Sequence, residues 1–214
     1  MAKSDSALRD FITAIISSDD GKASRLLAAS PELATATFQI GVTRATAKAY
    51  FLKEIGRYLY KGDTGLHIAA AAYRTELVRE LIKAGADVHA ENRLGDQPIH
   101  AAAVGAPGSR SWNPAAQAAT IVCLIKAGAD PNTADKHGVT PLHRAVRTRC
   151  AAAVRTLLEN EADPTRKNGR GSTPMLLATM TTGRGGSGSP EAKSQQQEIL
   201  RLLEKSLGSA TASR

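Results

Sequence analysis

Four copies of one short pattern recur along this chain, and they constrain its fold more than any other feature. The copies begin at Gly62, Gly95, Gly138 and Gly171, and the third reads Gly-Val-Thr-Pro-Leu-His. These glycines are 33, 43 and 33 residues apart. A period near 33 indicates a stack of similar units that bury their apolar faces against their neighbours, rather than one globular core. Such a stack offers an extended surface and no natural pocket.

Each unit carries a second signal that predicts its internal structure. The run from Leu77 to Lys83 has apolar residues at helical spacing, and Gly85-Ala86-Asp87 follows it. Similar closing triplets stand at 128–130 and 161–163. A glycine just past a helix fits a left-handed C-cap, and a proline fits the first helical position. We therefore expect each unit to be a turn, a helix, a short loop, a second helix and an extended polar hairpin.

Motif, closing triplet and period together resemble the ankyrin repeat family over roughly residues 60 to 207. Three positions depart from the pattern: Gly65 replaces its proline, Gln97 its threonine and Leu176 its histidine. The resemblance implies an all-α solenoid of helix-turn-helix units with hairpin loops and with capping helices at both ends. It also implies a structural role for the motif residues Thr64, His67, His100, Thr140, Pro141, His143, Thr173 and Pro174.

The domain boundaries follow from this register. Residues 1–61 are expected to hold an N-terminal capping repeat and an inserted helix at about 44–60. The repeat domain spans 62–207 in units 62–94, 95–137, 138–170 and 171–207, and its last helix serves as the C-terminal cap. Gly208 should end that helix, so that residues 208–214 form a frayed tail.

The stretch from 44 to 60 is the least expected part of the chain. Phe51, Leu52, Ile55 and Leu59 lie close to one face of a helix, and five basic residues between 44 and 61 accompany a single acid, Glu54. Two interpretations stay open: an extra helix packed on the stack, or an element that binds a partner or an anion. The second makes Tyr50, Lys53, Arg57 and Tyr58 a secondary partner site.

Two insertions separate the helices of the second and fourth units, at 106–116 and 182–192. The second insertion is rich in glycine and should be mobile. The first contains Trp112, the one tryptophan of the chain. Its indole either pins this loop to the body of the stack or anchors a partner.

We find no motif for catalysis, for a cofactor or for a metal, because neither a phosphate-binding loop nor a His-Glu-x-x-His pair occurs. The recurring histidines should lie one repeat apart, roughly 10 Å, which is too far for ligands that each lie about 2 Å from one zinc ion. Cys123 and Cys150 are too few for a disulfide framework. We therefore expect a non-enzymatic protein with reduced thiols.

The resemblance implies that a protein partner binds the concave side through hairpin tips and first-helix faces. Ten positions fall there by register: Tyr60, Lys61, Asp63, Arg93, Leu94, Asp96, Lys136, His137, Arg147 and Arg170. Cations outnumber acids among them, and the net charge of the chain is +8. We expect a rigid, mildly basic surface that binds an acidic segment of an unidentified protein, in an adaptor, inhibitor or scaffold role.

Two other functions remain alternatives. The basic face and the tyrosine-rich stretch at 44–60 would also suit a nucleic acid or an anionic surface, and a purely structural role in a larger assembly would show as self-association. The sequence has no apolar run near the roughly 18 residues of a membrane span and no apolar leader. We expect a cytoplasmic monomer, and the alanine-rich composition resembles that of bacterial proteins.

Overall fold

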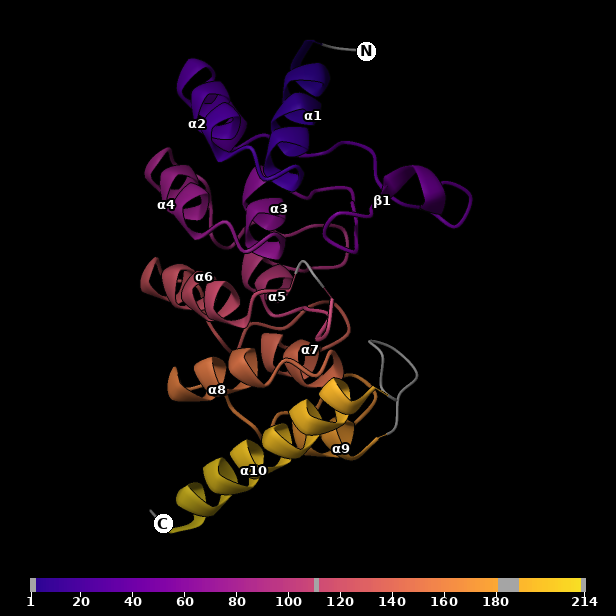
Figure 1. The fold of residues 1–214 in the computed structure, drawn as a ribbon, viewed down its shortest axis with the longest axis vertical. Helices are drawn as coiled ribbons and strands as arrows, with labels where there is room; N and C mark the ends of the chain where they lie inside the picture. The colour runs from indigo at the N-terminus through magenta and orange to yellow at the C-terminus, as the bar shows by residue number, and fades with distance from the viewer. Residues whose placement is uncertain (1–2, 110–111, 181–188, 213–214) are drawn as a thin grey trace.

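The computed structural model describes residues 3–109, 112–180 and 189–212. Helices stack in two layers along one axis, and the chain ends lie at opposite ends of the stack (Figure 1). The arrangement confirms the expected all-α solenoid. The inner layer comprises α1 (Lys3–Ile16), α3 (Gly65–Ala71), α5 (Pro98–Ala102), α7 (Pro141–Arg147) and α9 (Pro174–Thr179). The outer layer comprises α2 (Asp20–Ala29), α4 (Thr75–Lys83), α6 (Pro114–Lys126), α8 (Ala151–Glu159) and α10 (Pro190–Ala212).

The core runs the length of the stack because each unit supplies apolar residues at equivalent positions, most of them leucines. Leu66 and Leu142 on the inner helices, and Leu81, Leu124 and Leu157 on the outer ones, are fully buried in one continuous cluster. Inner helices contact the next inner helix, and outer helices the next outer one. Burial of these apolar faces between neighbours is the main source of stability in such a stack.

The start of each inner helix is fixed by the motif residues. The Thr64 Oγ1 accepts a hydrogen bond from the His67 backbone N–H at 3.3 Å, while the Thr64 N–H donates to His67 Nδ1 at 3.2 Å. Thr140 and His143 repeat this reciprocal cap. Two N–H groups that lack partners inside the helix are satisfied in this way, as in a capping box. Pro141 and Pro174 occupy the first helical position, where no N–H is needed.

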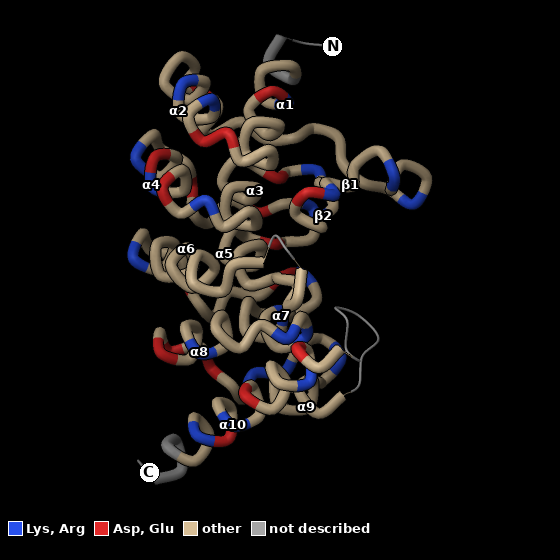
Figure 2. Tube along the Cα trace, viewed as in Figure 1, with Lys and Arg blue, Asp and Glu red and all other residues tan. Residues whose placement is uncertain are grey.

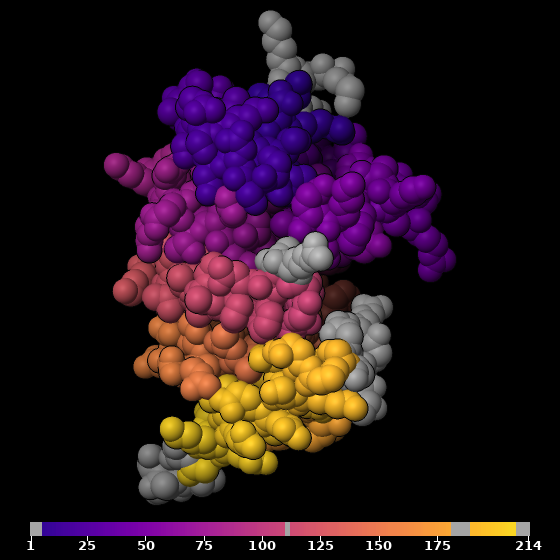
Figure 3. Space-filling model, in the orientation of Figure 1, coloured from indigo at the N-terminus to yellow at the C-terminus, as the bar shows by residue number. Residues whose placement is uncertain are grey.

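The helix predicted for about 44–60 is wrong. A 3₁₀ turn (Ala47–Tyr50) leads into a two-stranded antiparallel hairpin of β1 (Phe51–Leu52) and β2 (Arg57–Tyr58). Gly56 in the left-handed region turns the chain, and the Val42 N–H donates to the Leu59 carbonyl at 2.8 Å, which keeps Leu59 extended. Of the four apolar residues that suggested a helical face, Leu52, Ile55 and Leu59 pack against the core in the hairpin, whereas Phe51 is exposed. The segment stands out from the stack in Figures 1 and 3.

Helix α10 is longer than the sequence suggested. It passes through Gly208 and continues to Ala212, so the frayed tail predicted to begin at 208 is wrong for the backbone of residues 208–212. A glycine inside a helix costs about 1 kcal/mol relative to alanine, and no proline follows to end the helix. A 3₁₀ turn at Pro31–Ala34 connects α2 to the segment that precedes the hairpin.

Candidate functional site

The three motif histidines join one unit to the next. The Nε2 atoms of His67, His100 and His143 lie 2.9, 3.0 and 3.1 Å from backbone carbonyl oxygens of the following hairpin. All three rings are fully buried, and burial lowers their pKa values, that of His100 to about 4. Neutral rings that bridge backbone groups hold the hairpins in register. Within the described ranges, no group of three His, Cys, Asp or Glu residues could hold a metal ion.

Asp63 was expected on the partner face, but the structure places it inside the hairpin edge. Its side chain is fully buried and accepts hydrogen bonds from the Tyr60 N–H at 2.7 Å and from the Asn92 side-chain amide at 2.9 Å. Arg57 forms an ion pair with the same carboxylate at 3.0 Å. Asp63 therefore ties two hairpins and the β1–β2 segment together, and it presents no charge to solvent.

Asp96 is buried in the same way at the next interface. There the residue equivalent to Asn92 is Asp135, so that two carboxylates face one another. Arg144, from α7, forms ion pairs with both, at 3.0 Å with Asp135. At the first interface an asparagine amide donates to the buried carboxylate. At this interface the Arg144 guanidinium donates instead, because two buried carboxylates need a cation between them. The position of Asp96 in the repeat predicted that it binds a partner, and no role was predicted for Arg144. Position 135 is an aspartate where the preceding unit has an asparagine, and this difference is the signal that could have identified Arg144.

The cations predicted at the hairpin tips do lie on the surface. Lys61, Arg93, Lys136 and Arg170 are exposed, as is His137, while Leu94 is half-buried. Basic and acidic positions are interspersed on the side of the stack that carries β1 and β2 in Figure 2. The basic and acidic positions differ in burial, because Asp63, Asp96 and Asp135 are only 0, 1 and 7 % exposed. These three acids therefore lie beneath the exposed cations, whereas Glu91, two residues before Arg93, is an exposed acid.

Contacts between neighbouring tips order some of these cations. The Arg93 guanidinium donates to the Val42 carbonyl at 2.8 Å and lies 5.4 Å from the centre of the Tyr60 ring. Lys136 Nζ donates to the Arg93 carbonyl at 3.0 Å. An ordered side chain loses less entropy on binding than a mobile one.

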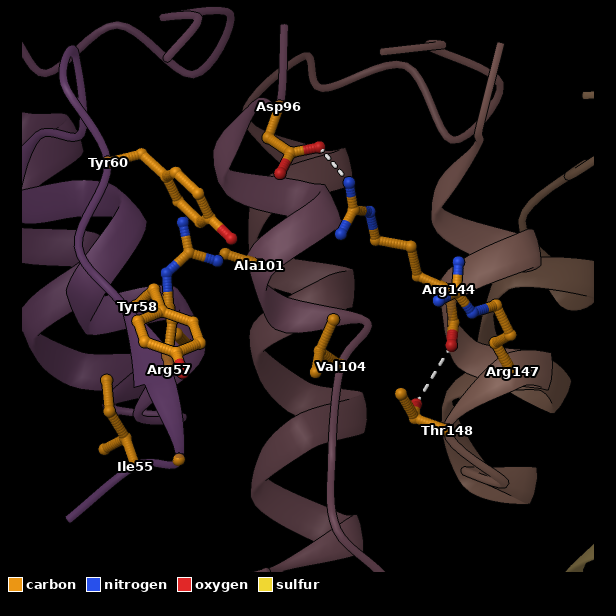
Figure 4. A pocket seen from close by; sticks show the side chains of 12 residues that line it. Ile55, Arg57, Tyr58, Tyr60, Asp96, Ala101, Val104, Arg144, Arg147 and Thr148 are labelled. Carbon is orange, nitrogen blue, oxygen red and sulfur yellow. Dashed lines mark hydrogen bonds and ion pairs between the residues drawn. The ribbon is translucent and has the colours of Figure 1, made fainter. Parts of the chain in front are cut away.

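A groove of about 340 Å³ lies between the β1–β2 segment and the inner helices (Figure 4). We call it the inner groove. Its floor is Ala71, Ala101 and Val104, and its two walls are formed by Arg57, Tyr58 and Tyr60 on one side and by Asp96, Arg144, Arg147 and Thr148 on the other. Ile55 and Gly56, at the hairpin turn, also line it. Because the floor residues are small, the groove is deep enough to hold a side chain.

The four residues of the predicted secondary site do not share one surface. Tyr50 is half-buried against the core and Lys53 is exposed. Arg57 faces the inner groove, with 12 % of its side chain exposed. Tyr58 is 39 % exposed and pairs with Phe51 across the hairpin, with ring centres 4.9 Å apart. Phe51, which is 42 % exposed, was missed because the helical pattern placed it in the core.

The insertion of the second unit is attached to the body of the stack. Trp112 Nε1 donates to Gln117 at 3.0 Å, and the Gln117 amide donates to the Ala102 carbonyl at 3.0 Å. A Cβ atom at Gly105 would lie 2.9 Å from the Trp112 ring, so only glycine fits beneath it. This geometry favours the pinning role for Trp112. Of the fourth unit's insertion, 182–188 lies outside the described residues.

The fourth unit ends the series of histidine bridges. Thr173 caps α9 by accepting from the Leu176 N–H at 3.2 Å. Leu176 stands where earlier units have histidine, and it is 46 % exposed. In the described part of the chain no further hairpin follows α9, so this position has no carbonyl to bridge.

Comparisons with known proteins agree with this geometry. A family model described as ankyrin repeat matches residues 61–93, and one described as ankyrin repeats in many copies matches residues 124–178. The insertion of the second unit falls between the two matches. No curated protein matches the chain. Among the helices of the described residues, none combines the length and the apolar character that crossing a membrane requires. The sequence motifs, the stacked helix pairs and both family matches lead to the same conclusion: the chain is an ankyrin repeat protein.

Proposed function

We propose that this protein binds an acidic segment of another protein along its hairpin tips and concave side, without catalysing a reaction. Ankyrin repeats are in general protein–protein interaction modules, and the finer assignment rests on one observation. At the tip positions Lys61, Arg93, Lys136 and Arg170 the exposed charges are cationic, whereas the neighbouring acids Asp63, Asp96 and Asp135 are buried and paired with arginines.

The scaffold suits rigid display of this surface. The histidine bridges and the buried ion pairs fix each hairpin to the next, so the tips keep their spacing before a partner arrives. A preorganised surface loses little conformational entropy on binding. Exposed cations raise the association rate with an acidic partner, and salt screens this effect. The protein would act by occupying a partner, as an adaptor, inhibitor or scaffold.

The proposal includes a monomer in a reducing compartment such as the cytoplasm. Both cysteines of the chain are free thiols, Cys150 is buried, and burial raises its pKa to about 11. A thiol held protonated in this way reacts poorly with oxidants. Light scattering after size-exclusion chromatography measures the oligomeric state, and a dimer at micromolar concentration would contradict the monomer.

The test compares two charge-reversal pairs of equal size. Arg93→Glu with Lys136→Glu reverses two tip cations. Lys83→Glu with Lys126→Glu reverses two exposed lysines in the last turns of the outer helices α4 and α6. Each variant is used to capture partners from the native cell lysate, with and without nuclease, at about 50 and about 300 mM salt.

We expect a protein partner that survives nuclease, that is lost with the tip pair and that is retained with the outer pair. Retention of that partner by the tip pair would contradict the proposal. Recovery of nucleic acid alone, lost with nuclease or salt, would favour the alternative in which the basic surface binds phosphates.

A further inference from the structure

The inner groove has features that the proposed function does not use. Its walls come from distant parts of the chain: the β1–β2 segment, which is an insertion before the first full unit, and helix α7 of the third unit. Figure 4 shows Arg57 and Arg144 on opposite sides of it, with Ala101 and Val104 between them. A cation on each side of a small-residue floor is a geometry that suits an anionic group.

Buried carboxylates hold both arginines in place. Asp63 fixes Arg57, and Asp96 with Asp135 fixes Arg144, whose side chain is 25 % exposed. After these ion pairs are made, the Nε–H groups of Arg57 and Arg144 still have no acceptor among the described residues. An unpaired buried donor costs free energy, and an arriving acceptor would recover it. The ion pairs hold both guanidinium groups in place before a ligand arrives. Because neither Nε atom is accessible in the structure, a small shift of the side chain lets a ligand oxygen reach it.

Arg147, Tyr60 and Ile55 complete the groove. Arg147 is exposed and lies three residues after Arg144, so both project from the same face of α7. Tyr60 packs over Arg57, with the guanidinium carbon 5.9 Å from the ring centre. Ile55 packs against the core at the hairpin turn and closes one end. The groove is thus a short slot that admits a side chain.

The local charge decides between a carboxylate and a phosphate. Three arginines line the groove (57, 144 and 147), and three aspartates line it or pair with these arginines (63, 96 and 135), so their formal charges cancel. A doubly charged phosphate would bring an excess of negative charge beside the buried acids. A carboxylate carries a single charge and fits the planar fork of a guanidinium. The affinity for a carboxylate would depend more on directed hydrogen bonds from the arginines than on the net charge of the groove.

We propose that the inner groove binds one aspartate or glutamate side chain of an extended partner segment, through Arg144 and Arg147 on α7 and Arg57 on the β1–β2 segment. The inference rests on the proposed function and adds the site where the specificity of that function resides. The tip cations attract the acidic segment, and the groove selects one of its residues.

The experiment selects ligands from a phage-displayed library of random peptides on the immobilised full chain. The best binders are synthesised with amidated C-termini, so that only side-chain carboxylates are tested, and each acid is replaced in turn by its amide. Affinities are measured by fluorescence anisotropy for the wild-type protein and for Arg147→Gln. Arg170→Gln, which removes an equal charge at an exposed tip outside the groove, is the matched control.

One acid of the peptide should dominate binding to the wild-type protein. Replacing it should weaken affinity about tenfold to hundredfold, the range for a lost hydrogen bond between charged groups. In Arg147→Gln the same replacement should matter much less, because the two changes remove one interaction. Arg170→Gln should retain the full effect. The effect should persist in about 0.5 M salt, where contributions of the exposed tips are screened.

Other outcomes would overturn the inference. If the dominant acid couples to Arg170 instead of Arg147, or if its effect disappears with salt, the tips hold it and the groove does not, while the proposed function stands. A library that yields no binder, or only binders without an essential acid, contradicts the groove. The proposed function fails separately, when reversal of the tip charges leaves the native partner bound.

Discussion

Acidification should weaken this fold through its buried histidines, and His100 allows the effect to be estimated. In the folded protein its Nδ1 accepts the Gln97 N–H at 3.0 Å and its Nε2 donates to the Val139 carbonyl at 3.0 Å. A proton added at Nδ1 would face another N–H. Burial likewise disfavours the charged ring and lowers its pKa from 6.5 to about 4.

The sign follows from proton binding in the two states. Between pH 4 and pH 6.5 the unfolded chain binds more protons at this histidine than the folded chain does, so the stabilising contribution is present above about pH 6.5 and is lost as the pH falls. With these pKa values, the free energy of unfolding at pH 5 is about 2 kcal/mol lower than at pH 7.5. For a chain of this size that corresponds to a melting temperature lower by about 4 to 8 °C. Burial lowers the pKa values of His67 and His143 as well, so their contributions have the same sign.

Urea unfolding followed by circular dichroism at several pH values from about 7.5 to 5 measures this loss. The range stays above the ordinary pKa values of carboxyl groups, about 4. His100→Gln removes the titrating group, so its stability should fall less steeply with pH than that of the wild type, whatever its stability at pH 7.5. His137→Gln, which replaces a histidine exposed at a hairpin tip, is the matched control variant. If the His100→Gln and wild-type curves run parallel, the reasoning is refuted.

Three substitutions test the packing of the stack by thermal unfolding. Leu81→Asp places an unpaired charge in a fully buried position and should cost several kcal/mol, abolishing the cooperative transition; an unchanged melting temperature would contradict the register. Gly105→Ala should cost about 1 to 3 kcal/mol because a Cβ would lie 2.9 Å from Trp112, and its indole fluorescence should report the displaced ring. Arg149→Ala removes a buried side chain that donates to the carbonyls of Ala178 at 3.0 Å and Met180 at 2.6 Å, so a loss of about 3 kcal/mol is expected. A loss within experimental error would show that water replaces those bonds.

The sequence by itself determined the repeat architecture. Motif, closing triplet and period are local signals that recur in register, and each unit meets the same neighbours. The resemblance to ankyrin repeats therefore implied structural roles for the threonine, proline and histidine positions before any coordinates. The cap joins residues only three apart, such as Thr64 and His67, so it recurs with the motif. The leucines at helical spacing likewise identified the core.

Tertiary structure decided what the charged residues do. Asp63, Asp96 and Asp135 look like surface acids in the sequence, because their partners are distant or in other segments: Arg57 is in the inserted segment, Asn92 is 29 residues from Asp63, and Arg144 is in the third unit. The conformation of 44–60 also depended on contacts outside it, such as the bond from the Val42 N–H to the Leu59 carbonyl. Local spacing there allowed a helix or a hairpin, and packing against the stack selected the hairpin. The inner groove exists because that hairpin lies opposite α7, and no pattern along the chain encodes that proximity.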